Sequence, residues 1–207
     1  MKGLFRWVLT LAVLSLFAVC STSAAELDGQ YEIAPPMLAP KAHSLDTLVI
    51  HEVFFFGCPH CYELHKEMPE FLKAYGKKVQ VISVPIGWAG PDAGRLLMIA
   101  RRVSPEKEEA VKTMIFDFIH AKGLGKSMFS RDKLQFVAKL NGLSTEFSQQ
   151  MDDPKIVKMM DEAMAYAKEK GVESTPTLII NDAVKVVGAD LNNLKLVVNS
   201  LLKEPVP

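Results

Sequence analysis

The segment around residues 47–75 constrains the fold more than any other part of the chain. Residues 47–56 read TLVIHEVFFF, a β-branched and aromatic run typical of a strand buried on both faces. The run leads into Cys58-Pro59-His60-Cys61, and apolar side chains then recur at helical spacing, at positions 64, 68, 71, 72 and 75. Proline suits the first position of a helix. The segment therefore predicts a buried strand that ends at two cysteines, with a helix starting on them.

The segments that flank this unit predict a mixed sheet. Residues 79–84 (VQVISV) form a second strand, and strand, helix and strand in that order imply a right-handed crossover between parallel strands. Residues 177–181 and 184–187 read as two further strands, and the turn Asn181-Asp182-Ala183 between them indicates an antiparallel hairpin. Asp190 is placed to cap a last helix over residues 191–202.

The middle of the chain has a different, helical character. Helices are expected to begin at Ser104-Pro105, at Ser130 and at Asp153-Pro154, and Gly171 ends the third. Residues 26–46 contain three prolines and are expected to form an irregular arm with room for a short edge strand. The sequence thus predicts an α/β domain over residues 47–90 and 171–207, interrupted by a helical subdomain over residues 91–170.

The N-terminus has the features of a secretory signal peptide. Lys2 and Arg6 precede an apolar run over residues 7–20, and small residues follow at a suitable cleavage site. We expect cleavage after Ala25, so that residues 1–25 are removed and the mature protein is exported. Two alternatives are a lipoprotein acylated at Cys20 and an uncleaved membrane anchor.

The cysteine count indicates redox chemistry. The chain has three cysteines, and removal of the signal peptide leaves only Cys58 and Cys61. Export would place them in a compartment where disulfides persist. A bridge between residues three apart closes a very small loop and removes little entropy from the unfolded chain, so it would be a poor structural crosslink. The formal net charge is zero with no block of like charges, which argues against nucleic acid or an anionic membrane as partner.

The predicted positions of the two cysteines give each a role. A sulfur at a helix N-terminus is stabilised as a thiolate by unpaired backbone N–H groups, and a protonated His60 would add positive charge beside it. Cys58 is therefore expected to be the sulfur that is attacked, and Cys61, one turn further along, the resolving thiol. A stabilised Cys58 thiolate is also a good leaving group, which would make the disulfide an oxidant.

Other uses of a C-x-x-C pair fit less well. A structural zinc site needs four ligands, and only His65 offers a third. Haem attachment needs histidine directly after the second cysteine, where this chain has Tyr62. An inert structural bridge is disfavoured by the short loop.

Glu52 and Pro176 are two further candidates whose role the residues alone leave open. Glu52 interrupts the apolar strand, and it is either a strand-edge side chain that reaches water or a buried acid that exchanges protons as Cys61 ionises. Pro176 precedes an apolar strand, where an ordinary trans proline is common. A cis bond would instead let backbone groups of the preceding residue face the cysteines and pair with an extended substrate.

With these residues in place, the chain resembles the DsbA family of periplasmic thiol:disulfide oxidoreductases, which have the thioredoxin fold with an inserted helical subdomain. The resemblance spans nearly the whole mature chain and rests on the signal peptide, 48-LVIHEVFFF-56, 58-CPHC-61, the helical block and 171-GVESTPTLII-180. It implies catalytic roles for Cys58 as nucleophile, Cys61 as resolving thiol, His60 and Pro59 between them, and Glu52 as buried acid. It also implies that Thr175–Pro176 form a cis-proline loop that binds substrate.

The resemblance further implies the partners. Unfolded or newly exported proteins that contain cysteines would be the substrates, a quinone-linked membrane protein of the DsbB type would reoxidise the disulfide, and no cofactor or metal would be needed. The protein would act as a monomer in the periplasm. The alternatives are a disulfide reductase or isomerase of the same fold, and a peptide-binding chaperone whose cysteines are incidental.

Two residues depart from the usual family pattern. The best-known members carry valine where this chain has Thr175, and threonine at that place also occurs in related isomerases. Gly57 removes a side chain beside Cys58 and is expected to widen access to it.

Overall fold

The computed structural model describes residues 27–35, 47–188 and 190–203. It contains a five-stranded mixed sheet in the order β1-β5-β4-β2-β3. The strands are β1 (Tyr31–Ile33), β2 (Leu48–Phe54), β3 (Val79–Pro85), β4 (Thr177–Ile180) and β5 (Val184–Val186). Strands β2 and β3 are parallel, whereas β2 with β4, β4 with β5 and β1 with β5 are antiparallel. The predicted parallel pair and hairpin are both confirmed, and β1 is the edge strand expected in the N-terminal arm.

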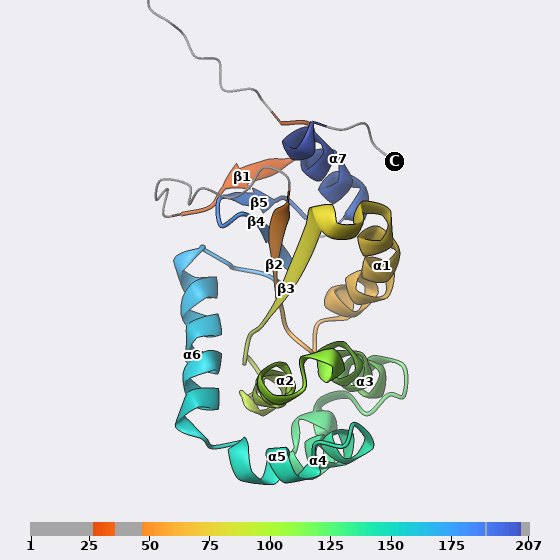
Figure 1. Ribbon diagram of the computed structural model, residues 1–207, viewed down its shortest axis with the longest axis vertical. Helices are drawn as coiled ribbons and strands as arrows, with labels where there is room; N and C mark the ends of the chain where they lie inside the picture. The colour runs from red at the N-terminus through yellow and green to blue at the C-terminus, as the bar shows by residue number, and fades with distance from the viewer. Residues whose placement is uncertain (1–26, 36–46, 189, 204–207) are drawn as a thin grey trace, which may run out of the picture.

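Helices cover both faces of this sheet (Figure 1). Helices α1 (Pro59–Tyr75) and α7 (Leu191–Leu202) lie on one face, and α6 (Pro154–Glu169) lies against the other. The alternation of side chains along β2 explains the arrangement. Ile50 belongs to the apolar cluster under α1 and α7, whereas the ring of His51 lies 4.8 Å from the ring of Tyr166 in α6.

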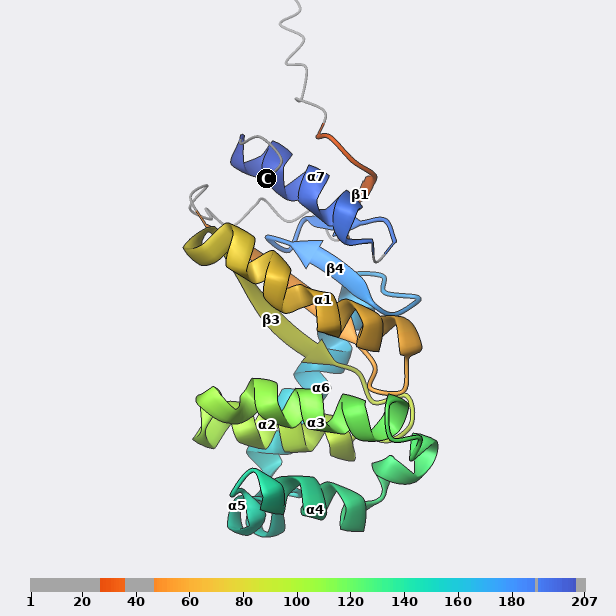
Figure 2. The same cartoon turned by 90° about the vertical axis from the view of Figure 1, so that its right-hand side faces the viewer.

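The helical block is an insertion between β3 and β4. It comprises α2 (Asp92–Val103), α3 (Glu108–His120), α4 (Arg131–Leu140), α5 (Ser144–Gln150) and α6, with 3-10 turns at Pro105–Lys107 and Gly125–Phe129. Figure 2 shows α2 to α5 gathered at one end of the sheet. The predicted fold class, a thioredoxin-like fold with an inserted helical subdomain, is confirmed. The exact domain boundaries stay a prediction.

The predicted helix caps are only partly present. The side chains of Asp153 and Asp190 accept hydrogen bonds from backbone N–H groups of α6 and α7, as expected for N-caps. Ser130 precedes α4, but its side chain makes no capping hydrogen bond. Pro105 begins a 3-10 turn, and α3 itself starts only at Glu108.

The predicted signal peptide, its cleavage site and Cys20 lie outside the described residues. Within the described ranges, no helix is long and apolar enough to cross a membrane.

The junction between sheet and insertion is formed by aromatic rings. The ring of Phe116 in α3 is fully buried and lies 5.5 Å from the ring of Phe54 and 5.0 Å from that of Phe56. Because Phe54 ends β2 and Phe56 precedes the cysteine motif, this contact ties the insertion to the segment that carries the cysteines.

Truncation of this junction is expected to destabilise the protein strongly. Phe116→Ala should lower the free energy of unfolding by about 3–5 kcal/mol, because it removes a buried ring and leaves a cavity. Phe136→Ala is the matched control, since Phe136 lies in the same insertion and is 50% exposed; it should cost less than about 1 kcal/mol. Urea unfolding followed by circular dichroism measures both. Equal losses in the two variants would contradict the assigned junction.

Candidate active site

The two cysteines lie at the N-terminus of α1 in very different environments. Cys58 is the residue that precedes the helix, in extended conformation, and its side chain is half-buried. Cys61 lies in the first helical turn and is 0% exposed. Both are thiols in this structure. A reactant from solution can therefore reach the sulfur of Cys58 but not that of Cys61.

The loop before β4 lies directly against Cys58. The Cys58 Sγ donates a hydrogen bond of 3.2 Å to the carbonyl oxygen of Thr175, which is 117 residues away in sequence. The peptide bond between Thr175 and Pro176 is cis, as the family resemblance implied. The fold thus brings together Cys58, Cys61 and the Thr175–Pro176 loop. The role of this loop in substrate binding stays a prediction.

The environment of Cys61 favours its neutral form. Burial raises the pKa of the Cys61 thiol well above its ordinary value, and the neighbouring Cys58 raises it further. When the pair is reduced, Cys61 therefore keeps its proton at neutral pH. A chemical step that releases Cys61 as a thiolate needs a proton source.

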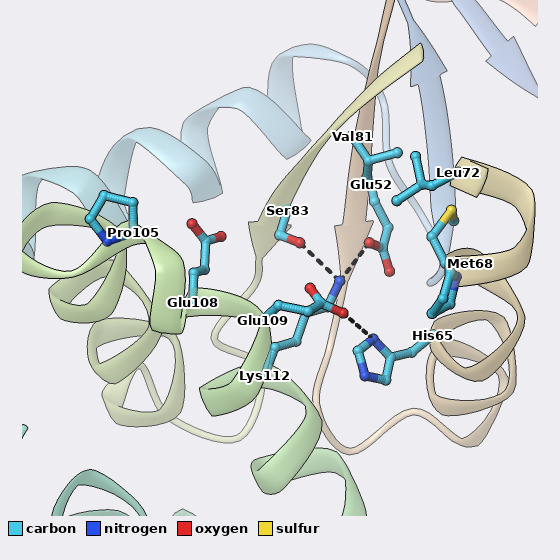
Figure 3. Close-up of a pocket in the computed structure, with 11 residues that line it drawn as sticks. Glu52, His65, Met68, Leu72, Val81, Ser83, Pro105, Glu108, Glu109 and Lys112 are labelled. Carbon is cyan, nitrogen blue, oxygen red and sulfur yellow. Dashed lines mark hydrogen bonds and ion pairs between the residues drawn. The ribbon is translucent and has the colours of Figure 1, made fainter. Parts of the chain in front are cut away.

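Glu52 is a buried acid with a buried cation as its partner. It is 1% exposed, so the strand-edge alternative is wrong. The Lys112 Nζ lies 2.6 Å from the Glu52 Oε2 and donates a second hydrogen bond of 2.8 Å to the Ser83 Oγ (Figure 3). The other carboxylate oxygen of Glu52 is buried without a hydrogen-bond partner in the described structure. No hydrogen bond joins Glu52 to either cysteine among the described residues.

Lys112 was not predicted as a site residue from the sequence, although a signal for it exists. Lys112 is three and four residues before Ile115 and Phe116, so it lies on the buried face of α3. A lysine on an apolar helix face usually needs a buried partner of opposite charge. Glu52 is such an acid in an apolar strand, so the two residues together indicate a buried ion pair.

A pocket of about 360 Å³ opens beside this ion pair, between α1 and α3. Glu52, Lys112 and Ser83 line it together with His65 and Glu109, as Figure 3 shows. The buried carboxylate therefore borders a partly open space that both charged and apolar side chains line.

His65 faces this pocket and not the cysteines. Its Nε2 lies 2.9 Å from the Thr113 Oγ1, and its Nδ1 lies 3.6 Å from a Glu109 oxygen. This position removes His65 as a third zinc ligand beside the two cysteines. In the part of the chain that the structure describes, no group of three or more His, Cys, Asp or Glu side chains is arranged to hold a metal ion.

The space beside Gly57 is filled, contrary to expectation. A Cβ at Gly57 would lie 2.5 Å from an atom of the Phe55 ring, so that ring covers the glycine. The Phe55 ring is in turn stacked on the ring of Phe129 at 5.7 Å and lies 6.0 Å from that of Trp88. Gly57 therefore does not widen access to Cys58, because the side chain of Phe55 occupies the space that a larger residue would take.

The two residues between the cysteines lie at the surface. Pro59 is the first residue of α1, as predicted, and both Pro59 and His60 are exposed. A role of His60 in tuning Cys58 stays a prediction.

Comparison with known proteins agrees with this arrangement. A family model described as thioredoxin matches residues 44–195, well over half of the chain. The thiol:disulfide interchange protein DsbA of Pseudomonas syringae pv. tomato is 24% identical over 173 residues, which cover 83% of this chain and 79% of that protein. The DsbA of Burkholderia cepacia is 20% identical over 195 residues, with 93% and 90% covered.

A solved structure gives the same result for the fold. The crystal structure of the oxidoreductase DsbA from Xylella fastidiosa superposes with a TM-score of 0.67 at 22% identity and covers 78% of this chain and 88% of that one. The chain therefore belongs to the thioredoxin family that the matching model describes. Within it, the chain is a DsbA-like thiol:disulfide oxidoreductase.

The state of His65 predicts a pH dependence of stability. Burial, together with the nearby charge of Lys112, lowers the pKa of His65 from 6.5 to about 4. Between these values the unfolded chain binds a proton at His65 and the folded protein does not, so stability falls as the pH drops from 6.5 towards 4.

The expected loss from this group between pH 7 and pH 5 is about 2 kcal/mol. Urea unfolding at both pH values measures it, with His65→Gln as the reference because glutamine does not titrate. The variant should lose about 2 kcal/mol less than the wild type over this interval. The same loss in both proteins would show that His65 is protonated in the folded state at pH 5.

Proposed function

We propose that this protein is a periplasmic thiol:disulfide oxidoreductase that donates its Cys58–Cys61 disulfide to exported substrate proteins. The observation that carries the proposal is the unequal exposure of the two sulfurs. Cys58 is accessible beside the Thr175–Pro176 loop, whereas Cys61 is fully buried. An external thiolate therefore has one sulfur to attack, and the buried one serves as the internal leaving group and resolving thiol.

The first step forms a mixed disulfide. A thiolate of the substrate protein attacks the Cys58 sulfur in line with the Cys58–Cys61 bond, a new bond forms between the two proteins, and Cys61 leaves as a thiolate. Because burial raises the pKa of the Cys61 thiol, this thiolate takes up a proton at neutral pH. That proton uptake pulls the first step forward.

The second step releases the oxidised substrate. A second thiolate of the substrate attacks its own sulfur in the mixed disulfide, the substrate disulfide forms, and Cys58 leaves as a thiolate stabilised by the N-terminus of α1. The substrate has lost two electrons and the protein now carries two thiols. A quinone-linked membrane partner of the DsbB type would accept these electrons and restore the Cys58–Cys61 bond.

The substrate chain would lie in extended conformation beside Thr175 and Pro176. In the dithiol form, the Thr175 carbonyl oxygen accepts the hydrogen bond of the Cys58 thiol. Backbone contacts there would hold a peptide largely independently of its sequence, which suits unfolded, newly exported chains.

Glu52 is proposed as the proton donor and acceptor for Cys61. Its carboxylate is buried on β2, the strand that leads to the motif, one of its oxygens has no hydrogen-bond partner in the described structure, and the adjacent pocket is partly open. The proton would pass between Glu52 and Cys61 through an intervening water molecule. Lys112 would orient the carboxyl group through its hydrogen bond to the other oxygen.

Cysteine variants test the main proposal. Cys61→Ser, first loaded at Cys58 as a mixed disulfide with glutathione, should exchange the glutathione for an unfolded model protein with a single thiol. The mixed disulfide between the two proteins should accumulate, because the internal thiol that reverses this intermediate is absent. Cys58→Ser should form no such adduct and should oxidise no substrate. Non-reducing gel electrophoresis of acid-quenched mixtures measures the adduct.

The equilibrium with glutathione separates the proposed donor from its alternatives. A disulfide donor should be reduced at a low ratio of glutathione to glutathione disulfide, whereas a strongly reducing pair would indicate a reductase or isomerase. A double variant with serine at both positions that kept full activity would indicate a peptide-binding chaperone and refute the proposal.

The proposed role of Glu52 has its own test. Glu52→Gln keeps the shape of the side chain but removes the exchangeable proton. It should slow formation of the mixed disulfide, the step in which Cys61 leaves, by roughly tenfold or more at pH 7, a modest share of what general acid–base catalysis contributes. In the Cys61→Ser background, where Cys61 is absent, the same change should not alter the rate of adduct formation. Slowing in both backgrounds would assign Glu52 a purely structural role.

A further inference from the structure

The last turn of α3 contacts the cysteine segment on both of its sides. Before the motif, the His120 Nε2 lies 2.8 Å from the carbonyl oxygen of Phe56, two residues before Cys58. After the motif, the Tyr62 hydroxyl donates a hydrogen bond of 2.9 Å to the Asp117 Oδ1. Both partners belong to the inserted helix α3, although the cysteines belong to the thioredoxin-like part of the chain.

His120 touches both sides at once. A carbonyl oxygen only accepts hydrogen bonds, so the proton is on Nε2 and His120 donates to Phe56. The imidazole ring is also stacked on the ring of Tyr62, with centroids 5.0 Å apart and planes inclined by 11°. One side chain of the insertion is therefore fixed to the backbone before Cys58 and to the side chain after Cys61.

We propose that His120 is a positioning residue that holds the backbone around Cys58 and Cys61 in the geometry needed to close their disulfide. The inference rests on the proposed function, since it concerns the same cysteine pair. A disulfide requires two sulfurs about 2 Å apart with a defined dihedral angle. A segment that is already held at both ends loses little conformational freedom when the bond forms.

Loss of the contact from His120 should shift the redox equilibrium of the cysteine pair in one direction. Without the contact from His120, the dithiol form gains freedom in this segment, whereas the closed disulfide stays constrained by its own bond. Glutathione disulfide oxidises the dithiol to the Cys58–Cys61 bond and releases two molecules of glutathione. The equilibrium constant of this reaction should fall when the contact is lost, so the protein should become a stronger oxidant.

Two substitutions at position 120 separate the hydrogen bond from packing. His120→Phe keeps a ring to stack on Tyr62 but has no donor, and it should lower the equilibrium constant with glutathione by roughly threefold to tenfold, the range expected for one hydrogen bond. His120→Gln keeps an N–H donor and should stay within about twofold of the wild type. Mass spectrometry after alkylation measures the fraction of disulfide in each glutathione buffer.

Further variants guard against misfolding and unspecific effects. Tyr62→Phe keeps the ring stack and loses only the bond to Asp117, so it should shift the constant in the same direction by a smaller factor. Phe136→Leu, an exposed aromatic residue in α4 of the same insertion, should leave the constant unchanged. Circular dichroism of each variant confirms the native fold before the titration.

The outcomes are distinct from those that test the function. A wild-type constant in His120→Phe, or the same shift in His120→Gln as in His120→Phe, would overturn the positioning role. A wild-type protein that forms no disulfide with glutathione would overturn the proposed function, and this inference with it.

Discussion

The buried pair of Glu52 and Lys112 is the interaction on which the two parts of the molecule depend. A carboxylate buried in an interior strand of a sheet costs several kcal/mol when it has no partner. Here the partner comes from α3 of the insertion, with 2.6 Å between the charged atoms and a second hydrogen bond to Ser83 on β3. Removal of either partner would leave a single charge in the interior, which is far more costly than removal of both. The ion pair therefore fixes the position of the insertion relative to the sheet.

The same dependence on the insertion recurs around the cysteines. Rings of Phe116 and His120 from α3 pack against Phe56 and Tyr62, which flank the motif. On the other side, the insertion ends with α6, and the chain then runs within a few residues into the Thr175–Pro176 loop. Two segments outside β2 and α1 thus contact the motif. One is the inserted helix α3, and the other is the loop that follows the inserted helix α6. The chemistry belongs to the thioredoxin-like part, and the insertion sets its surroundings.

The parts of the fold that could be predicted are those with local causes. The strand before the motif, the start of α1 at Pro59 and the capping role of Asp190 each follow from a few adjacent residues. The turn at Asn181 and Asp182 is of the same kind, because both residues adopt the positive φ that asparagine and aspartate tolerate.

What could not be predicted depends on segments that are distant in sequence or on the direction of a side chain. The pairing of Glu52 with Lys112 spans 60 residues, and the contact of Cys58 with Thr175 spans 117. The family resemblance placed Thr175 near the motif, but no spacing in the sequence did. Gly57 is the opposite case: its covering residue, Phe55, is only two positions away. The rotamer of Phe55 decides whether the space beside Cys58 is open. That rotamer depends on contacts with Phe129 in the insertion and with Trp88 in the loop between β3 and α2.

Trp88 gives this aromatic contact a practical consequence. The chain has two tryptophans, and the other, Trp7, lies in the predicted signal peptide. The mature protein would therefore carry a single tryptophan, half exposed, with its ring beside the phenylalanine that covers Gly57 next to Cys58. Its emission would respond to events at one sulfur without any label, so the molecule contains its own optical reporter of the active site.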